Sequence, residues 1–276
     1  MLPAAPAWRR VLSFFLLPLS IPYGLAAAAR RRWWRGRSIE LGVPVISVGN
    51  LTCGGTGKTP TVEMLSRELV DRGWNPAILS RGYGAGPGGG NDEYKVLSEN
   101  LPSVAHYQGA DRVAVGREAI AAGADILVLD DGFQHLRMHR DLDLVLLDAL
   151  QPFDSGRLLP AGLLREPVGS LAAADLVAVT RTQLVSDGRR DSIAAFLDER
   201  FPGVPVLFIE SKPLAWQELY GETLDPGLLE GKEVCAFCGI GNPHSFELAL
   251  EKMGIRTAGF RIFRDHQFYK RFVSSN

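Results

Sequence analysis

A glycine-rich loop between an apolar run and an amphipathic segment constrains the fold of this chain most. Residues 43–48 are apolar, residues 49–60 read GNLTCGGTGKTP, and apolar residues then recur at Val62, Leu65 and Leu69. A buried strand, a glycine-rich turn and Gly-Lys-Thr at the start of a helix form the context in which a P-loop binds nucleotide phosphates. The sequence therefore predicts a nucleotide-binding α/β fold, and a glycine-rich turn with a fortuitous Gly-Lys-Thr is the alternative.

Each part of this loop suits a role in phosphate binding. Glycines leave no side chain between the backbone and a ligand, so successive N–H groups can converge on phosphate oxygens. We expect Lys58 to reach the β- and γ-phosphates and the Thr59 hydroxyl to bind Mg²⁺. The loop is a variant, because the usual G-x-x-x-x-G-K-[ST] spacing calls for glycine where this chain has Thr52. The predicted nucleotide-binding residues are Thr52, Gly54, Gly55, Thr56, Gly57, Lys58 and Thr59.

Apolar runs of strand length alternate with helical patterns along most of the chain. This alternation predicts a mostly parallel sheet with helices on both faces. With 276 residues, 46% of them hydrophobic, the chain can bury the core of one large domain or two smaller ones. We expect a nucleotide-binding core at 38–183 and a smaller α/β lobe at 184–276. The predicted strands lie at 43–48, 77–79, 126–129, 142–147, 176–179, 204–209 and 234–237, and the predicted helices at 58–71, 111–122, 191–200 and 243–253.

The first 37 residues have the composition of a membrane-associating segment. Residues 11–29 are almost uncharged, and arginines flank them together with Trp33 and Trp34. The run is close to the minimum length for one crossing, and Pro18 and Pro22 disturb a straight helix, so a helix lying in the interface and a spanning helix both remain open. A cleaved signal peptide or a buried helix of a soluble protein would also fit the apolar run. The near balance of 30 basic and 31 acidic residues gives no argument for a nucleic-acid partner.

Charged residues follow several of the predicted strands. Asp130 and Asp131 end the run 126–129, where a P-loop site needs a carboxylate for Mg²⁺, and their side chains should face opposite ways. Asp92 follows a glycine-rich segment and could orient an attacking hydroxyl. Arg157 and Arg165 lie in a turn-rich segment suited to clamping a phosphate, although surface salt bridges are the alternative.

Taken together, these motifs resemble the tetraacyldisaccharide 4'-kinase family, the lipid A 4'-kinases of bacterial outer-membrane biogenesis. The series occurs in the family's order between residues 43 and 266. It consists of GNLTCGGTGKTP, SRGYG, Asn-Asp-Glu, DDGFQH, GRLLPAGLLREP, FCGIGNP and Asp-His. The loop variant with Thr52 also matches the family's pattern. The apolar N-terminal segment is similar to the family's membrane anchor.

The resemblance implies a reaction and a set of residues. It implies transfer of the γ-phosphate of ATP, with Mg²⁺, to the 4'-hydroxyl of a tetraacylated glucosamine disaccharide 1-phosphate, which gives lipid IVA. The implied location is the cytoplasmic face of the bacterial inner membrane, with membrane lipids as partners. The implied roles are general base for Asp92, paired with His266; phosphate and metal binding for Lys58 and Thr59; metal binding for Asp130 and Asp131; and contact with a substrate phosphate for Arg112 and Arg165.

Two departures from the family pattern and two rival functions remain at this point. The family more often has Gly-Asp-Glu-Pro where this chain has residues 91–94, NDEY. The chain also stops at Asn276, where the family continues through a Thr-Glu-Lys-Asp segment, so we expect either a fragment or a reduced C-terminal lobe. One rival is a membrane-associated P-loop ATPase or nucleotide-switch regulator without a lipid acceptor. The other is a soluble P-loop ligase or GTPase, and the absence of an Asn-Lys-x-Asp sequence argues against the GTPase.

Overall fold

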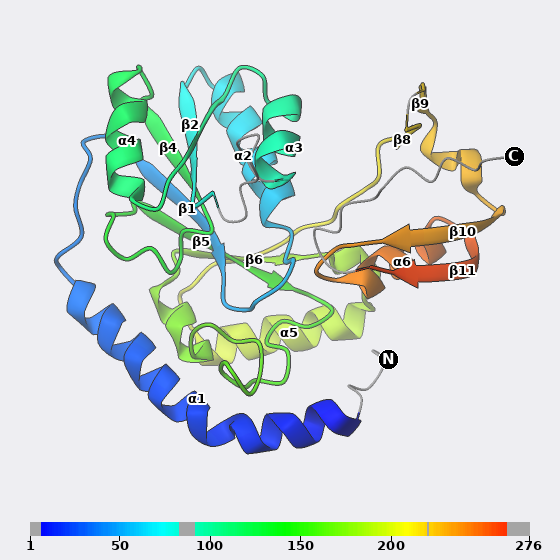
Figure 1. Cartoon of the computed structure of the whole chain (residues 1–276), viewed down its shortest axis with the longest axis horizontal. Helices are drawn as coiled ribbons and strands as arrows, with labels where there is room; N and C mark the ends of the chain where they lie inside the picture. The colour runs from blue at the N-terminus through cyan, green and yellow to red at the C-terminus, as the bar shows by residue number, and fades with distance from the viewer. Residues whose placement is uncertain (1–6, 83–91, 220, 264–276) are drawn as a thin grey trace, which may run out of the picture. The chain divides into compact units, whose positions relative to one another are not determined.

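The computed structural model describes residues 7–82, 92–219 and 221–263 of the chain (Figure 1). The chain forms two compact units, Met1–Glu210 and Ser211–Asn276. The first unit contains the N-terminal helix, the glycine-rich loop and the large sheet. The second contains two small sheets and one α-helix within its described residues.

A seven-stranded parallel sheet forms the centre of the first unit. Its strand order is β3-β2-β4-β1-β5-β6-β7. The inner strands are buried along almost their whole length, because helices cover both faces, and they therefore read as unbroken apolar runs in the sequence. The strands are β1 Val45–Asn50, β2 Pro76–Ser80, β3 Ala105–Gln108, β4 Ile126–Asp130, β5 Leu142–Asp148, β6 Leu176–Thr180 and β7 Val206–Phe208.

Amphipathic helices cover the two faces of this sheet. Val62 of α2 and Leu97 of α3 pack into one core cluster. Val113 of α4 and Leu197 of α5 pack against the strand residues that point the other way. The predicted fold class, a mostly parallel sheet with helices on both faces, is confirmed. These helices are α2 Lys58–Asp71, α3 Asp92–Asn100, α4 Arg112–Ala121 and α5 Asp187–Arg200.

The centre of the sheet is also the point where the strand order reverses. β1 lies between β4 and β5, and Val48 of β1 pairs in register with Asp130 of β4. The glycine-rich loop follows β1, so the loop and Asp130 meet at the carboxyl edge of neighbouring strands. Ligands of open α/β sheets bind at this position.

Helix α1, Ala7–Trp34, runs along the surface of the first unit as one continuous curved helix (Figure 1). It contains Pro18 and Pro22 without a break. Its most apolar stretch of 18 residues has a mean hydropathy of 1.8, and the helix from residue 11 to residue 34 is long and apolar enough to cross a membrane by length and composition. Most of its large apolar side chains are exposed, including Phe14 at 66% and Phe15 at 71%. The interpretation of this segment as a buried helix of a soluble core is therefore excluded.

The second unit begins later than the expected boundary between residues 183 and 184. Helix α5 and strand β7 follow that boundary, yet β7 pairs with β6 and extends the large sheet. The compact unit ends only at Glu210 for this reason. The second unit contains the antiparallel pair β8 Trp216–Gln217 and β9 Thr223–Leu224, and the parallel pair β10 Glu233–Cys238 and β11 Arg256–Ile262, with α6 Pro243–Lys252 between β10 and β11 in the chain.

Candidate active site

The glycine-rich loop is fixed at both of its ends. Gly54 and Gly57 have φ angles of 115° and 88°, values that favour glycine because a side chain would be strained there. The carbonyl of Thr56 accepts a hydrogen bond from the Thr180 hydroxyl at 2.9 Å. The carbonyl of Gly55 accepts one from Arg181 at 2.8 Å, and Arg181 also pairs with Asp148. Side chains at the end of β6 therefore hold the loop carbonyls, and α2 begins directly afterwards at Lys58.

Asn50, the last residue of β1, connects the loop to the rest of the site. Its side chain is fully buried, and its amide donates to the carbonyl of Thr52 at 2.8 Å. Its Oδ1 accepts from Lys58 Nζ at 3.3 Å and also from the Arg165 guanidinium. Gln134 donates to the Asn50 carbonyl at 2.9 Å. One buried amide thus orients the lysine, the loop and an arginine that lies 115 residues further along the chain.

Thr52, which stands where a typical P-loop has glycine, is part of a short backbone pairing. It forms an isolated antiparallel bridge with Leu164, and the N–H of Cys53 donates to the carbonyl of Leu163 at 2.7 Å. The threonine is buried, with 7% of its surface exposed. Extended backbone suits a β-branched residue better than glycine, which accounts for the variant spacing. The bridge places the following Arg165 beside the loop.

The two adjacent carboxylates at the end of β4 have different surroundings. Burial, reinforced by the charge of Glu93, raises the pKa of Asp130 to about 7, although Lys58 opposes the shift. Asp130 Oδ1 has no hydrogen-bond partner among the described residues. Asp131 has a φ of 53° and turns away from the strand. Burial raises its pKa, but hydrogen bonds from Arg165 and the positive charges of Lys58 and Arg165 outweigh burial and lower the pKa to about 2.

Three cations surround Asp131. Arg165 donates to both of its carboxylate oxygens, at 2.7 and 2.8 Å. Lys58 Nζ lies 3.8 Å from Oδ1, and Arg112 donates to its backbone carbonyl at 3.0 Å. Arg112 is itself only 5% exposed, and burial lowers its pKa from the ordinary arginine value. The ionised Asp131 carboxylate compensates the positive charge of these three side chains while no ligand is bound, and the same side chains suit an anionic ligand.

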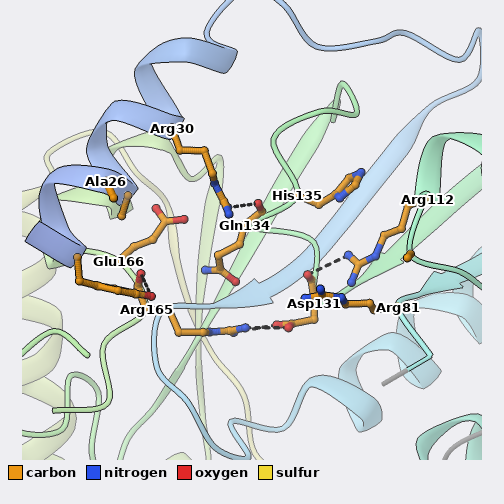
Figure 2. A pocket seen from close by; sticks show the side chains of 12 residues that line it. Ala26, Arg30, Arg81, Arg112, Asp131, Gln134, His135, Arg165 and Glu166 are labelled. Carbon is orange, nitrogen blue, oxygen red and sulfur yellow. Dashed lines mark hydrogen bonds and ion pairs between the residues drawn. The ribbon is translucent and has the colours of Figure 1, made fainter. Parts of the chain in front are cut away.

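A cavity of about 590 Å³ lies between this cluster and helix α1 (Figure 2). Four arginines line it against two carboxylates. His135 also lines it, and burial together with the neighbouring arginines lowers its pKa to about 4, so the imidazole is neutral near pH 7. The cavity is therefore positively charged on balance and suits a phosphorylated ligand. Its lining residues are Tyr23, Ala26, Ala27, Arg30, Arg81, Ala110, Arg112, Asp131, Gln134, His135, Arg165 and Glu166.

Comparison with known proteins identifies the family. A family model described as tetraacyldisaccharide-1-P 4'-kinase matches residues 12–274. The chain belongs to this family. The tetraacyldisaccharide 4'-kinase of Syntrophus aciditrophicus is 40% identical over 84% of this chain and 69% of its own length. That of Halorhodospira halophila is 38% identical over 92% of this chain and 76% of its own length.

A solved member of the 4'-kinase family has the same fold. The crystal structure of LpxK from Aquifex aeolicus in complex with ATP matches with a TM-score of 0.70 and 31% identity, over 95% of this chain and 86% of that chain. The expected enzyme class is confirmed: the chain is a kinase of lipid A biosynthesis that acts on tetraacyldisaccharide 1-phosphate. The kinase activity is therefore favoured over the two rival functions, the ATPase or switch regulator and the soluble ligase or GTPase.

The fold of this chain brings most of the predicted site residues together. Lys58, Asp130, Asp131, Arg112 and Arg165 lie around the end of β4 and the glycine-rich loop. Helix α3 begins at Asp92. His266, its implied partner, lies outside the described residues. Arg157 donates to the Ser13 hydroxyl of α1 at 2.9 Å, so it contacts the helix and does not line the cavity.

Several residues of the 4'-kinase site gave only a weak signal in the sequence. Asn50 is a polar residue at the end of an apolar strand, and that position alone could have indicated a role. Arg30, Gln134 and His135 line the cavity, but nothing in their spacing shows that the N-terminal helix meets the end of β4. Arg181 has a φ of 57°, a strained value for arginine that becomes visible only in the structure.

Proposed function

We propose that the residues around the glycine-rich loop transfer the γ-phosphate of ATP directly to the 4'-hydroxyl of the lipid acceptor. Phosphoryl transfer requires mainly positioning and neutralisation of charge, so it needs no covalent nucleophile. The loop amides and Lys58 bind the phosphates, and Asn50 and Asp131 hold the ammonium group of Lys58 in place. The observation that carries this proposal is the convergence of Lys58 and Arg165 on Asp131, which lines a positively charged cavity together with Arg165.

The residues at the end of β4 fit a magnesium ion bound together with ATP. Magnesium in kinases keeps several waters and takes only one or two carboxylates, so it needs no cage of three or more acidic side chains. The described residues contain no such cage. They do contain the buried Asp130, whose Oδ1 lacks a hydrogen-bond partner among them. We propose that Asp130, Asp131 and Thr59 hold the ion directly or through water; when bound, it neutralises the β- and γ-phosphate charges.

We propose that Asp92 is the general base for the acceptor hydroxyl, with His266 as its partner. The support for these two roles is the resemblance of their motifs to those of the family. Arg112 and Arg165 are proposed to contact the substrate's phosphate. Both line the cavity, and both are already paired with Asp131, which keeps their guanidinium groups oriented before the lipid arrives.

We further propose that α1 lies in the membrane interface on the cytoplasmic face of the inner membrane. Its polar contacts with the core run from Ser13 to Arg31, roughly 27 Å along the helix axis. A helix held sideways over that length cannot cross a bilayer unless the loop it contacts enters the hydrocarbon as well. Its exposed apolar face suits partial immersion. The acyl chains of the substrate can then stay in the bilayer, where removal would cost about 0.8 kcal/mol per methylene.

The Asp92→Ala variant tests the proposed mechanism. We expect the rate of lipid phosphorylation to fall by about 10³-fold, because loss of a general base typically costs 10²- to 10⁴-fold. ATP affinity should change little. Glu99→Ala is the matched control, since Glu99 is an exposed acidic residue of the same helix. The assay follows transfer from Mg-ATP to detergent-dispersed substrate, and near-normal turnover would remove Asp92 as the base.

A further inference from the structure

Helix α1 contacts the two chain segments that carry Asp131 and Arg165. The Tyr23 hydroxyl donates to the carbonyl of Arg165 at 3.0 Å. Arg30 donates to the carbonyl of Gln134, in the segment that follows Asp131. Figure 2 shows α1 beside the cavity, with Arg30 pointing toward Gln134. The helix is therefore a wall of the active site as well as a surface for the membrane.

The ion pair between Arg31 and Glu166 is the most buried of these contacts. Nε and Nη2 of Arg31 lie 2.9 and 2.6 Å from the same carboxylate oxygen, and the Glu166 side chain is only 6% exposed. The guanidinium also lies 4.5 Å from the ring centroid of Phe133, which is fully buried. Arginine can pair with a carboxylate and stack on a ring at once because its charged group is planar. A buried carboxylate needs such a partner, since leaving it alone is costly.

Arg31 thus contacts one residue within two positions of each of two proposed active-site residues, Asp131 and Arg165. Glu166 follows Arg165, and Phe133 lies two residues after Asp131. Arg165 and Asp131 are joined by two hydrogen bonds of 2.7 and 2.8 Å. Only short stretches of chain therefore separate the two contacts of Arg31 from the two ends of this pair. The exposed apolar face of α1 points the other way, so the same helix meets the membrane and the site.

We propose that Arg31 is a positioning residue that acts through Glu166 and Phe133 to hold Arg165 against Asp131. The proposal rests on the proposed function, in which Asp131 and Arg165 belong to the phosphate-transfer site. On this proposal, the packing of α1 against the core affects catalysis, because the site is fully assembled only when the Arg31–Glu166 ion pair holds the helix in place. The N-terminal helix then contributes to the turnover number in addition to membrane attachment.

The Arg31→Met variant of the full chain tests this role, because methionine keeps an unbranched apolar stem and removes the charged guanidinium group. We expect kcat for the lipid substrate to fall about tenfold, which corresponds to about 1.4 kcal/mol and lies within the range of coupling energies between residues of one ion-pair network. The KM for ATP should stay within about twofold, since Arg31 does not touch the loop. Arg31→Lys should recover part of kcat. Arg72→Met is the matched control, because it removes the exposed pair with Glu68 on α2.

Two further variants keep the test decisive. If Arg31→Met alone does not fold, the double variant Arg31→Met/Glu166→Met removes both buried charges and should fold, because apolar pairs often replace buried ion pairs without loss. Its kcat should be reduced like that of the single variant. A wild-type kcat in either folded variant overturns the positioning role. Asp131→Asn separates the two proposals: if it too is fully active, the proposed function fails, and if it is inactive while Arg31→Met is normal, only this inference fails.

Discussion

The two walls of the cavity are held in place by different means. The sheet wall consists of the residues after β4 that line the cavity, together with the glycine-rich loop segment that contacts them through Lys58 and Asn50. It is fixed by backbone hydrogen bonds and by fully buried residues such as Asn50. The helix wall, formed by α1, is held by a few polar side chains, and its outer face is exposed and apolar. In the proposed function, the sheet wall sets the chemistry of phosphate transfer, whereas the helix wall sets where the reaction occurs and how precisely the site is assembled.

The largest expected effect concerns Lys58 on the sheet wall. In Lys58→Ala, the rate of phosphate transfer should fall by about 10³-fold, at the upper end of what is lost when one preorganised charge donor is removed. The measurement is single-turnover transfer to the lipid at saturating Mg-ATP. Lys95→Ala, at an exposed position of α3, should keep normal turnover. If Lys58→Ala lost less activity than the Arg31→Met variant of the helix wall, the division between the two walls would be wrong.

The next effect concerns the outer face of the helix wall. Phe14 and Phe15 are 66% and 71% exposed, and burying each in the bilayer interface contributes about 1.5 to 3 kcal/mol. The variant Phe14→Asp/Phe15→Asp should therefore lower partitioning into inner-membrane-like vesicles by at least about 10²-fold. Flotation of vesicles with bound protein measures this, and ATP binding checks the fold. Met64→Asp, at an exposed position of α2, is the control for added charge. Unchanged partitioning of the double variant would refute the interfacial helix.

The sequence predicted the sheet wall far better than the helix wall. The buried strands appeared as apolar runs, and the limits of α2 were predicted without error because a glycine turn, Gly-Lys-Thr and helical periodicity all indicate the same start. Strand β3 was missed, since its sequence Ala-His-Tyr-Gln is half exposed and carries no apolar run. Helix α3 was missed because it directly follows a glycine-rich segment that indicates only a loop.

Contacts between distant parts of the chain could not be predicted. The Arg31–Glu166 pair joins residues 135 positions apart, and a run of arginines beside an apolar segment indicates a membrane flank without identifying which arginine turns inward. The same holds for Asn50, whose partners come from three different segments. Motifs identified the chemistry because its residues follow strands, while the position of α1 depends on side chains that meet only after folding.

A smaller effect distinguishes the two adjacent carboxylates of the sheet wall. The pKa of Asp130 is raised to about 7, so the protonated form is favoured in the folded state. The protonated Asp130 carboxyl therefore contributes fully to the stability of the folded protein below about pH 4, and this contribution is lost as the pH rises to about 7. Asp130→Asn resembles the protonated form and should raise the free energy of unfolding of the ATP-free protein by about 2 to 4 kcal/mol at pH 8.

Urea unfolding at about pH 5 and pH 8 measures the effect of Asp130→Asn, and the gain should be larger at the higher pH. Asp131→Asn is the matched comparison. The pKa of Asp131 is lowered to about 2, so its ionised form stabilises the folded state above its ordinary pKa and that contribution is lost only in strong acid. This variant should therefore be destabilised at both pH values. Equal effects of the two variants would contradict the different surroundings assigned to these neighbours.

The smallest effect concerns Thr52, where the two walls are joined through the backbone. Thr52 pairs with Leu164, and the following Arg165 and Glu166 reach Asp131 and Arg31. Glycine at this position keeps the backbone hydrogen bonds but adds freedom to the unfolded chain, so Thr52→Gly should lower the free energy of unfolding by about 1 kcal/mol. ATP affinity should stay within about threefold, because the loop carbonyls are held from β6. A large loss of ATP affinity would mean that the Thr52 side chain itself acts on the nucleotide, and that the bridge is not its main role.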